Sequence, residues 1–359
     1  MKTLFKGTYN GKKVLLTGHT GFKGSWLQFW LMELGADVTG FALKPNTTPS
    51  HVELLKLHCK SIIGDIRNAE MIKEVVEVTK PDIVFHLAAQ PLVRRSYEDP
   101  SETFQTNILG TVNLFEAIRN SPSVKAVVNV TTDKVYRNLN LELAFRETDV
   151  LGGHDPYSTS KACVELIHES YHKSFFEHSK ILSATARAGN VIGGGDWSQD
   201  RLIPDVVKSV ALGRPAEIRN PNSVRPWQHV LDPLSGYLLL GQSLLEGKSQ
   251  IDNAWNFGPS LADCLSVAEV LKKFQVKWNG IKWTDVLDKD QTHEALVLRL
   301  DCSKAKGILG WSPVWNLDKA IEKTASWYSK FYTSGELLTR SNLHEYIEDA
   351  ISQGAPWIS

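Results

Sequence analysis

Short apolar runs alternate along the first half of the chain with longer segments whose apolar residues have helical spacing, and this alternation constrains the fold most. The first run, residues 13–17, stops at Gly18 and leads into such a helical segment. Strands that alternate with helices form a parallel sheet with helices on its faces. The sequence therefore predicts an α/β fold built on a doubly wound parallel sheet. The expected strands are residues 13–17, 37–43, 61–63, 83–85, 126–130 and 181–186, and the expected helices are residues 26–34, 69–78, 102–119 and 157–176.

The alternation breaks after Arg187, which suggests a second, smaller unit. Residues 189–200 are rich in glycine, and short strands and helices mix beyond them. A domain commonly has about 100 to 200 residues, so a chain of 359 suits two units. We expect residues 1–188 to form a Rossmann-like domain, and residues 189–359 to form mainly a mixed α/β lobe with some segments returning to the first domain. The end of the chain is predicted to be one amphipathic helix with a loose tail.

The composition excludes several classes of protein. The 40 basic side chains balance 40 acidic ones and 42% of residues are hydrophobic, which argues against a disordered chain and against a basic nucleic-acid binder. No apolar run approaches the roughly 20 residues that span a bilayer. The N-terminal residues lack the apolar stretch of a signal peptide, so we expect a cytoplasmic protein. The cysteines are predicted to be reduced thiols without a metal-binding pattern; they are Cys59, Cys163, Cys264 and Cys302.

A glycine-rich turn joins the first expected strand to the first expected helix. Glycines let the backbone approach a pyrophosphate, and a helix N-terminus directs free N–H groups at it, so the turn is predicted to bind a dinucleotide. An ordinary tight turn is the alternative. Lys23 either adds a charge near the phosphates or is solvated. The residues of the turn are Thr17, Gly18, His19, Thr20, Gly21, Phe22, Lys23 and Gly24.

The acidic residue that commonly binds the adenosine ribose about 20 positions later is missing. Residues 40–44 contain no carboxylate and Lys44 could face a 2′-phosphate, so this site leaves NAD and NADP open. Asp65, followed by Ile66, is placed either to meet the adenine or to cap a helix. Small residues after the fourth strand fit a backbone passing close to a flat cofactor, or plain packing; this segment is Leu87, Ala88, Ala89 and Gln90.

Tyr157 and Lys161 are four residues apart at the start of an expected helix and so share one face. A neighbouring positive charge favours the phenolate, which could exchange a proton with a sugar hydroxyl. The same spacing occurs at Tyr9 and Lys13, where no site is expected, so the spacing alone has little weight. The position after the fifth strand is what singles out Tyr157.

Polar residues also follow the strand at 126–130. They emerge at the carboxyl end of a central strand, where open α/β sheets bind ligands. Thr131, Thr132 and Asp133 could instead form a turn that caps the strand.

Several arginines gather with other polar residues in the second half of the chain. Arginine grips phosphate through two parallel hydrogen bonds, so the cluster suggests a second phosphorylated ligand. Its members are Arg187, Asn190, Asp196, Arg201, Arg214, Arg225 and His229.

Together these segments resemble the extended short-chain dehydrogenase/reductase family. The shared motifs are Thr17-Gly-x-x-Gly21-x-x-Gly24, Leu87-Ala88-Ala89, Thr132-Asp133 and Tyr157-x-x-x-Lys161. Residues 152–161, 187–197 and 225–230 are similar to nucleotide-sugar 4,6-dehydratases, and to the branch acting on CDP-glucose in particular.

One position separates the branches of that family. Dehydratases acting on thymidine- or guanosine-linked sugars typically carry Thr-Asp-Glu at the strand end, whereas this chain has Lys134, as the CDP-glucose branch does. Sugar epimerases usually lack the acidic residue, so Asp133 argues against epimerisation.

The resemblance implies NAD as cofactor, CDP-glucose as substrate, and a homodimer or tetramer formed through helix pairs. The product, CDP-4-keto-6-deoxyglucose, would feed deoxysugars of bacterial lipopolysaccharide O-antigen. The expected catalytic residues are Thr132, Asp133, Lys134, Tyr157 and Lys161. The expected substrate-binding residues are Asn190, Arg201, Arg225 and His229.

These groups suggest roles. Tyr157, aided by Lys161 and Thr132, would take the proton of the sugar C4 hydroxyl, and Asp133 would protonate the C6 hydroxyl. Lys134 is either the base at C5, which requires its pKa to fall by about 3 units, or a charged group that stabilises the enolate. The alternatives are a dehydratase or epimerase for another nucleotide sugar, and a cofactor-sensing regulator. A regulator would be expected to lose the tyrosine or the lysine, and this chain keeps both.

Overall fold

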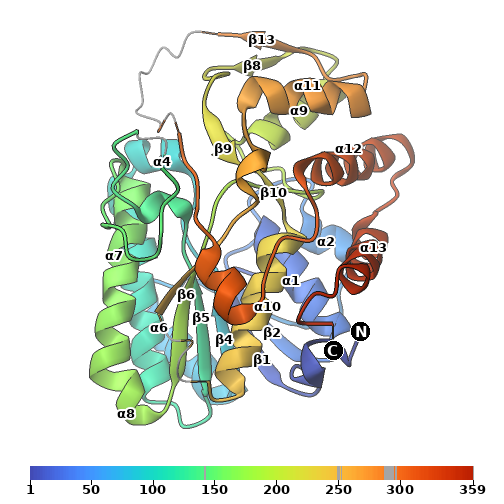
Figure 1. The fold of residues 1–359 in the computed structure, drawn as a ribbon. Helices are drawn as coiled ribbons and strands as arrows, with labels where there is room; N and C mark the ends of the chain where they lie inside the picture. Colours follow the sequence, from blue (N-terminus) through green and yellow to red (C-terminus); the bar gives the residue numbers. More distant parts are fainter. Residues whose placement is uncertain (141–142, 249–250, 252, 287–294, 296, 359) are drawn as a thin grey trace.

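A seven-stranded parallel sheet forms the centre of the molecule (Figure 1). The computed structural model describes residues 1–358 apart from 141–142, 249–250, 252, 287–294 and 296. The strand order is β11-β6-β5-β4-β1-β2-β3, so the chain winds outward in both directions from the β1–β4 boundary. The predicted doubly wound α/β fold is confirmed. The strands are β1 (Lys13–Thr17), β2 (Asp37–Ala42), β3 (Lys60–Ile63), β4 (Ile83–His86), β5 (Ala126–Val130), β6 (Leu182–Ala188) and β11 (Asn253–Phe257).

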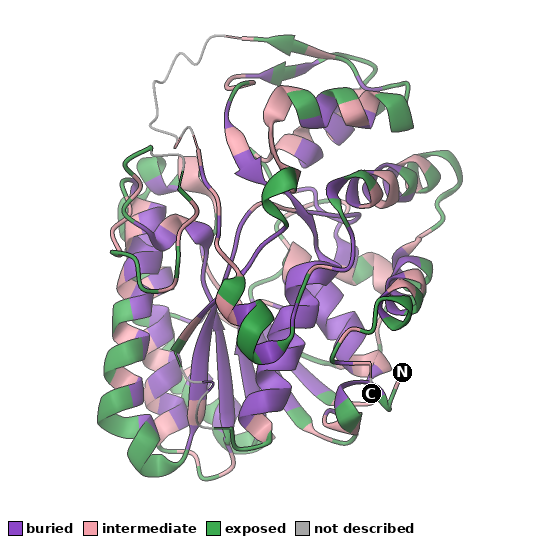
Figure 2. Cartoon of the chain, viewed as in Figure 1, coloured by how far each residue is buried: buried purple, intermediate pink, exposed green. Residues whose placement is uncertain are grey.

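Helices cover both faces of this sheet, because successive strand residues point to opposite sides. Val14 and Leu16 pack in one core with α1 (Phe22–Glu33) and α10 (Leu231–Leu245). Leu15 packs on the other side, against the helices of the opposite face. Figure 2 shows the sheet and the inner helix faces as one buried interior. The opposite face carries α3 (Ala69–Thr79), α6 (Gly110–Arg119) and α7 (Pro156–Tyr171).

The expected helix at 102–119 consists of three consecutive segments: α5 (Pro100–Phe104), the π-helical η2 (Gln105–Leu109) and α6. The expected helix at 157–176 consists of α7 followed by the π-helical η4 (His172–Phe176). The remaining elements before residue 188 are η1 (Leu4–Gly7), α2 (His51–Leu55), α4 (Val93–Glu98), η3 (Asp133–Val135) and α8 (Glu177–Ser179).

A smaller lobe with its own core lies at one end of the sheet, at the top of Figure 1. Trp197, Trp227 and Phe274 are buried in that core. Several elements after residue 188 belong to the sheet domain. β11 pairs with β6, α10 packs on β5, and the buried residues of η7 (Ala305–Leu309) and α13 (Thr339–Ser352) lie in the same core as Val14 and Leu16. The other elements after residue 188 are β7 (Val191–Ile192), α9 (Leu202–Ala211), β8 (Ala216–Ile218), β9 (Val224–Pro226), β10 (Gln228–His229), η6 (Leu261–Asp263), β12 (Cys264–Ser266), α11 (Val267–Lys277), β13 (Trp283–Asp285) and α12 (Leu317–Ser334).

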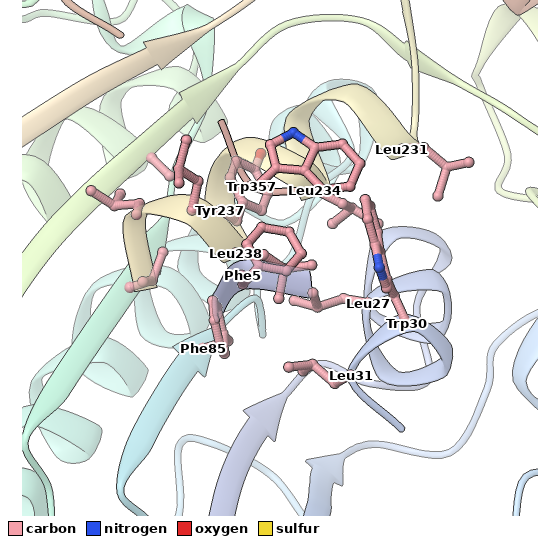
Figure 3. Close-up of a cluster of buried hydrophobic side chains, with 14 of the residues drawn as sticks. Phe5, Leu27, Trp30, Leu31, Phe85, Leu231, Leu234, Tyr237, Leu238 and Trp357 are labelled. Atoms are coloured by element: carbon pink, nitrogen blue, oxygen red, sulfur yellow. The ribbon is translucent and has the colours of Figure 1, made fainter. Parts of the chain in front are cut away.

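The prediction of a loose C-terminal tail is wrong. Trp357 is fully buried, and its ring stacks on Phe5 with centroids 5.2 Å apart and meets Trp30 edge-on at 5.7 Å. Figure 3 shows these rings beside the side chains of α1 and α10. Burial of aromatic surface from both ends of the chain ties the tail to the sheet domain. No helix in the described part of the chain is both long and apolar enough to cross a membrane.

Candidate active site

A cavity of about 630 Å³ lies between the carboxyl end of the sheet and the smaller lobe. Ligand sites of open α/β sheets lie at this edge, and the volume is typical of small-molecule sites. The strand ends of β5 and β6, the start of α7, and the segments before α9 and in β9 line it. Eight of the predicted site residues line it: Lys23, Thr132, Asp133, Lys134, Tyr157, Asn190, Arg201 and Arg225.

The turn after β5 holds a buried carboxylate in the cavity wall. Asp133 is fully buried, and its Oδ1 accepts a hydrogen bond of 3.0 Å from the Thr132 hydroxyl and lies 3.2 Å from Lys134 Nζ. Among the described residues nothing bonds to its Oδ2. A Cβ on Gly189 would come within 2.6 Å of Oδ2, so only glycine leaves this side clear. One oxygen of Asp133 is therefore anchored, and the other is available to a ligand hydroxyl.

The start of α7 fixes Tyr157. Asp155 caps the helix by accepting from Ser158 N at 2.9 Å, and Pro156 occupies the first helical position. Tyr157 is buried and hydrogen-bonds with the Thr132 side chain. Burial raises the pKa of Tyr157 to about 12, although Thr132 lowers it. The prediction that the phenol ionises easily is therefore wrong for this state, because the cost of burying a phenolate outweighs its stabilisation by nearby groups.

Lys161 lies one turn further along α7. Its Nζ donates to Val130 O at 3.2 Å, at the last residue of β5. Burial lowers the pKa of Lys161 to about 8, and Glu165 opposes this shift. The predicted pair thus faces the end of β5 from a single helix, with the phenol of Tyr157 in the cavity.

The glycine turn forms a close-packed cradle. A Cβ on Gly24 would lie 2.1 Å from Gly18 O, and one on Gly18 would lie 2.7 Å from Ala88 N. Thr17 Oγ1 accepts from Leu87 N and Ala88 N at 3.2 Å, which joins the turn to the end of β4. No side chain caps the start of α1, so its N–H groups stay available to an anion. The backbone therefore fits the pyrophosphate of a dinucleotide.

Three side chains of this turn are already engaged within the protein. His19 Nε2 lies 2.7 Å from Ser61 Oγ, and Thr20 Oγ1 donates to Leu43 O at 3.0 Å. Phe22 packs against Gly193 of the smaller lobe. Any contact that His19 or Thr20 makes with a cofactor would therefore come from the backbone. The sequence motif does not distinguish backbone from side-chain contacts.

Lys23 is not a solvated lysine. It lines the cavity, and its Nζ lies 3.4 Å from the Tyr237 hydroxyl. Burial, with Arg201 second, lowers the pKa of Lys23 to about 7.

On the predicted adenine side of the cradle, Asp65 is partly exposed and Ile66 is buried. Asp65 is paired with Arg67 at 2.6 Å, and this hydrogen bond lowers the pKa of Asp65. The cap of α3 is Asn68, which accepts from Met71 N, so the capping alternative for Asp65 is wrong. Ile66 is buried against Gly110, whose Cβ would lie 2.6 Å from it.

The segment after β4 is held from inside the protein. Ala89 lies in this segment between Ala88 and Gln90. Gln90 N donates to Asn107 Oδ1 at 2.8 Å, and the Gln90 side chain donates to Thr103 at 2.9 Å. The backbone of this segment is therefore fixed beside the glycine turn.

Of the predicted substrate residues, three reach the cavity and one does not. Arg201 Nη1 lies 3.2 Å from Asp196 Oδ2, and Arg225 and Asn190 lie on the walls. His229 is fully buried, with its ring 4.7 Å from that of Trp315, and is not among the residues that line the cavity. Burial lowers the pKa of His229 to about 3. Its prediction as a substrate contact is wrong, because it packs between aromatic rings.

The sequence patterns did not point to several parts of the cavity wall, among them residues 91–94 and 137–139. Residues 91–94 follow Gln90 directly, so their position after β4 was the available signal. Residues 137–139 follow η3, where no motif marked them. No group of His, Cys, Asp and Glu that could hold a metal ion occurs among the described residues.

Comparisons with known proteins agree with this geometry. Residues 15–324 match the family described as GDP-mannose 4,6 dehydratase. The CDP-glucose 4,6-dehydratase of Salmonella typhimurium is 46% identical over 342 residues, which cover 93% of this chain and 95% of that protein. The dTDP-glucose 4,6-dehydratase of Haemophilus influenzae is 27% identical over 339 residues, which cover 88% of this chain and 97% of that protein.

Solved structures share the fold. The dTDP-glucose 4,6-dehydratase of Bacillus anthracis in complex with NAD has a TM-score of 0.74 at 24% identity, covering 88% of this chain and 96% of that one. The UDP-glucose 4-epimerase of Thermotoga maritima with UDP-glucose has a TM-score of 0.77 at 24% identity, covering 89% and 99%.

Proposed function

The chain belongs to the GDP-mannose 4,6 dehydratase family, and we propose that within it the protein is an NAD-dependent CDP-glucose 4,6-dehydratase. One observation carries this proposal: a single cavity is lined by Thr132, Asp133, Lys134 and Tyr157. The 46% identity to a CDP-glucose 4,6-dehydratase supports the choice of substrate. The product is CDP-4-keto-6-deoxyglucose.

The glycine cradle holds the cofactor by its pyrophosphate, through backbone N–H groups at the start of α1. When bound, NAD supplies reversible hydride acceptance. With residues 40–44 carrying no carboxylate, the ribose is held without the usual acidic partner.

Tyr157 begins the reaction by taking the proton of the C4 hydroxyl through its phenol oxygen, relayed by the hydroxyl of Thr132. Because burial raises the pKa of Tyr157 to about 12, the phenol is protonated at rest, and it passes this proton to water before it takes the C4 proton. Lys161, a buried cation one turn away, stabilises the negative charge that develops in between. The C4 ketone that results makes the C5 proton acidic.

Asp133 then protonates the C6 hydroxyl, which leaves as water. Its free Oδ2 is the oxygen placed for this transfer, since Oδ1 is held by Thr132 and Lys134. The elimination transfers the C5 proton to water while the C6 hydroxyl leaves with the proton that Asp133 gives up, and Asp133 recovers its proton from solvent. Bound NAD would supply the hydride that completes the 6-deoxy sugar at C6.

Lys134 has an electrostatic role in this proposal. Its ammonium pairs with Asp133 and its side chain is 30% exposed, which is not the dry environment that a neutral lysine base requires. A cation there stabilises the enolate that forms between C4 and C5. The diphosphate of the substrate is held by Arg201, Arg225 and Asn190, which line the same cavity.

The proposed assembly is a homodimer through α6 and α7. Leu109 before α6, Leu166 on α7 and Phe175 in η4 are 54%, 55% and 39% exposed, and exposed large apolar side chains suit a partner surface. Pairing of dimers into tetramers is a further step that a sizing experiment separates. All four cysteines are free thiols, which suits the reducing cytoplasm.

Incubation with a panel of nucleotide sugars tests the proposal. CDP-glucose should lose about 18 mass units, the mass of water, and should be used at least ~100-fold more efficiently than dTDP-glucose, a gap of about 2.7 kcal/mol. Equal use of the two would reduce the function to a nucleotide-sugar dehydratase of broad specificity. No mass loss with any of them would reject dehydration.

A further inference from the structure

A buried ion pair lies beside the end of β5, the strand that leads into Thr132 and Asp133. Glu165 on α7 and Arg187 on β6 are 5% and 3% exposed. Arg187 Nη2 lies 2.8 Å from Glu165 Oε2, and Arg187 Nε donates to Oε1 at 3.0 Å, so the pair is bidentate. Arg187 was grouped with the phosphate-binding candidates, but this pairing turns it away from a ligand.

Glu165 also binds the ends of two strands. The Thr131 hydroxyl at the end of β5 donates to its Oε1, and the Thr185 hydroxyl on β6 donates to its Oε2 at 2.6 Å. Thr131 directly precedes Thr132 and Asp133. Burial alone would raise the pKa of Glu165, but Arg187 and the hydroxyl groups outweigh burial and hold that pKa below its usual value. Glu165 is therefore a carboxylate with a full set of partners.

Arg187 extends the network to the turn that carries the catalytic groups. Its Nη1 donates to the Tyr136 hydroxyl at 2.8 Å, and that hydroxyl donates to Asn256 on β11 at 2.7 Å. The segment from Thr131 to Tyr136, which includes Asp133 and Lys134, is thus held at both ends by one ion pair.

Glu165 follows Lys161 by one helical turn, so the two side chains share a face of α7. We propose that Glu165 is a positioning residue for the dehydration, keeping Lys161 charged in its buried site and fixing the strand end that presents Thr132 and Asp133. This inference rests on the proposed function. In this inference Glu165 controls the charge of Lys161, and so of the Tyr157–Lys161 pair, without touching substrate or cofactor.

Other titratable groups face the same lysine. They are Lys23 from α1, His86 from β4 and Tyr157 on α7 itself. A charge on Lys23 opposes a charge on Lys161, whereas burial keeps His86 neutral. Among the described residues, Glu165 is the group that raises the pKa of Lys161. Without the carboxylate, burial would act on Lys161 unopposed.

The test is the pH profile of kcat with CDP-glucose for four proteins. In the wild type the alkaline limb should lie near pH 8, where Lys161 loses its charge. Glu165→Gln keeps the shape of the side chain and removes its charge, so the limb should move to lower pH by about one unit or more. Thr185→Val removes a hydrogen bond from Glu165 but leaves the charge, and its limb should stay in place.

The fourth protein, Glu165→Met/Arg187→Leu, also lacks Glu165 and serves as the test if Glu165→Gln does not fold. Replacing a buried ion pair by apolar residues is often tolerated, so Glu165→Met/Arg187→Leu should fold and should also show the shifted limb. Thermal melting identifies folded variants. A limb that stays at the wild-type pH in every folded variant lacking Glu165 would overturn the inference, even if kcat fell. A wild type that does not dehydrate CDP-glucose would instead reject the proposed function.

Discussion

In the proposed mechanism, Tyr157 and Asp133 have different tasks because their surroundings differ. Tyr157 meets the Thr132 hydroxyl in a buried site, whereas Asp133 has one oxygen anchored and one free. Tyr157→Phe removes only the phenol oxygen, so we expect kcat to fall by about 10² to 10⁴ with the fold and NAD binding retained. Steady-state kinetics and calorimetry with NAD measure both. Turnover within tenfold of the wild type would contradict the role given to the phenol.

In the proposed mechanism, Asp133 and Lys134 act after the oxidation at C4, so their loss should separate the two halves of the reaction. Lys134→Ala and Asp133→Asn should still oxidise C4 but should eliminate water slowly. Reduced cofactor would then accumulate and be visible by its near-ultraviolet absorbance. Tyr157→Phe is the matched control, since it stops the reaction earlier and should accumulate none. If both variants dehydrate at the wild-type rate, the roles given to this strand end are wrong.

At the scale of elements, the junction of β1 and α1 depends on glycine at one tight contact. A Cβ on Gly24 would lie 2.1 Å from Gly18 O, a backbone atom that cannot move without opening the turn. Gly24→Ala should therefore weaken NAD binding by at least about tenfold, a loss of about 1.4 kcal/mol. Gly307→Ala, where a Cβ meets nothing within 4 Å, is the control and should bind as the wild type does. Equal affinity for the two variants would mean that the turn is not the cofactor cradle.

Elements with a local signal could be predicted from the sequence, and those defined by distant partners could not. The glycine turn and the Tyr157 helix follow from spacing within a few residues. β11 joins the sheet only through β6, about 70 residues earlier along the chain, as its pairing of Asn253 with Ala184 shows. His229 carried the right chemistry for a ligand contact, but its place between aromatic rings depends on Trp315.

At the scale of the whole molecule, buried histidines should make stability depend on pH. Burial lowers the pKa values of five histidines to between about 3 and about 4; they are His19, His51, His86, His168 and His229. Below pH 6.5 these histidines become protonated in the unfolded chain but stay neutral in the folded protein. The free energy of unfolding therefore decreases as the pH falls. Two carboxyl groups act the other way, the partly buried Asp205 and the fully buried Asp232, since desolvation raises the pKa of Asp205 to about 6 and that of Asp232 to about 7.

The histidines outnumber these carboxyl groups, so the free energy of unfolding should drop by up to about 4 kcal/mol per pH unit near pH 5. Urea unfolding between pH 7 and pH 5 measures this slope. His51→Gln should reduce this slope by about one proton, or about 1.4 kcal/mol per pH unit. A stability that is flat over this range would contradict the neutral, buried state of these side chains.

The central claim is that one cavity oxidises C4, expels water and returns the same hydrogen at C6. CDP-glucose carrying deuterium at C4 tests it most directly. The account predicts that the product formed in ordinary water carries the deuterium at C6, while the same reaction in heavy water places solvent deuterium at C5. Deuterium that stays at C4, or that is lost to solvent or free cofactor, would contradict it.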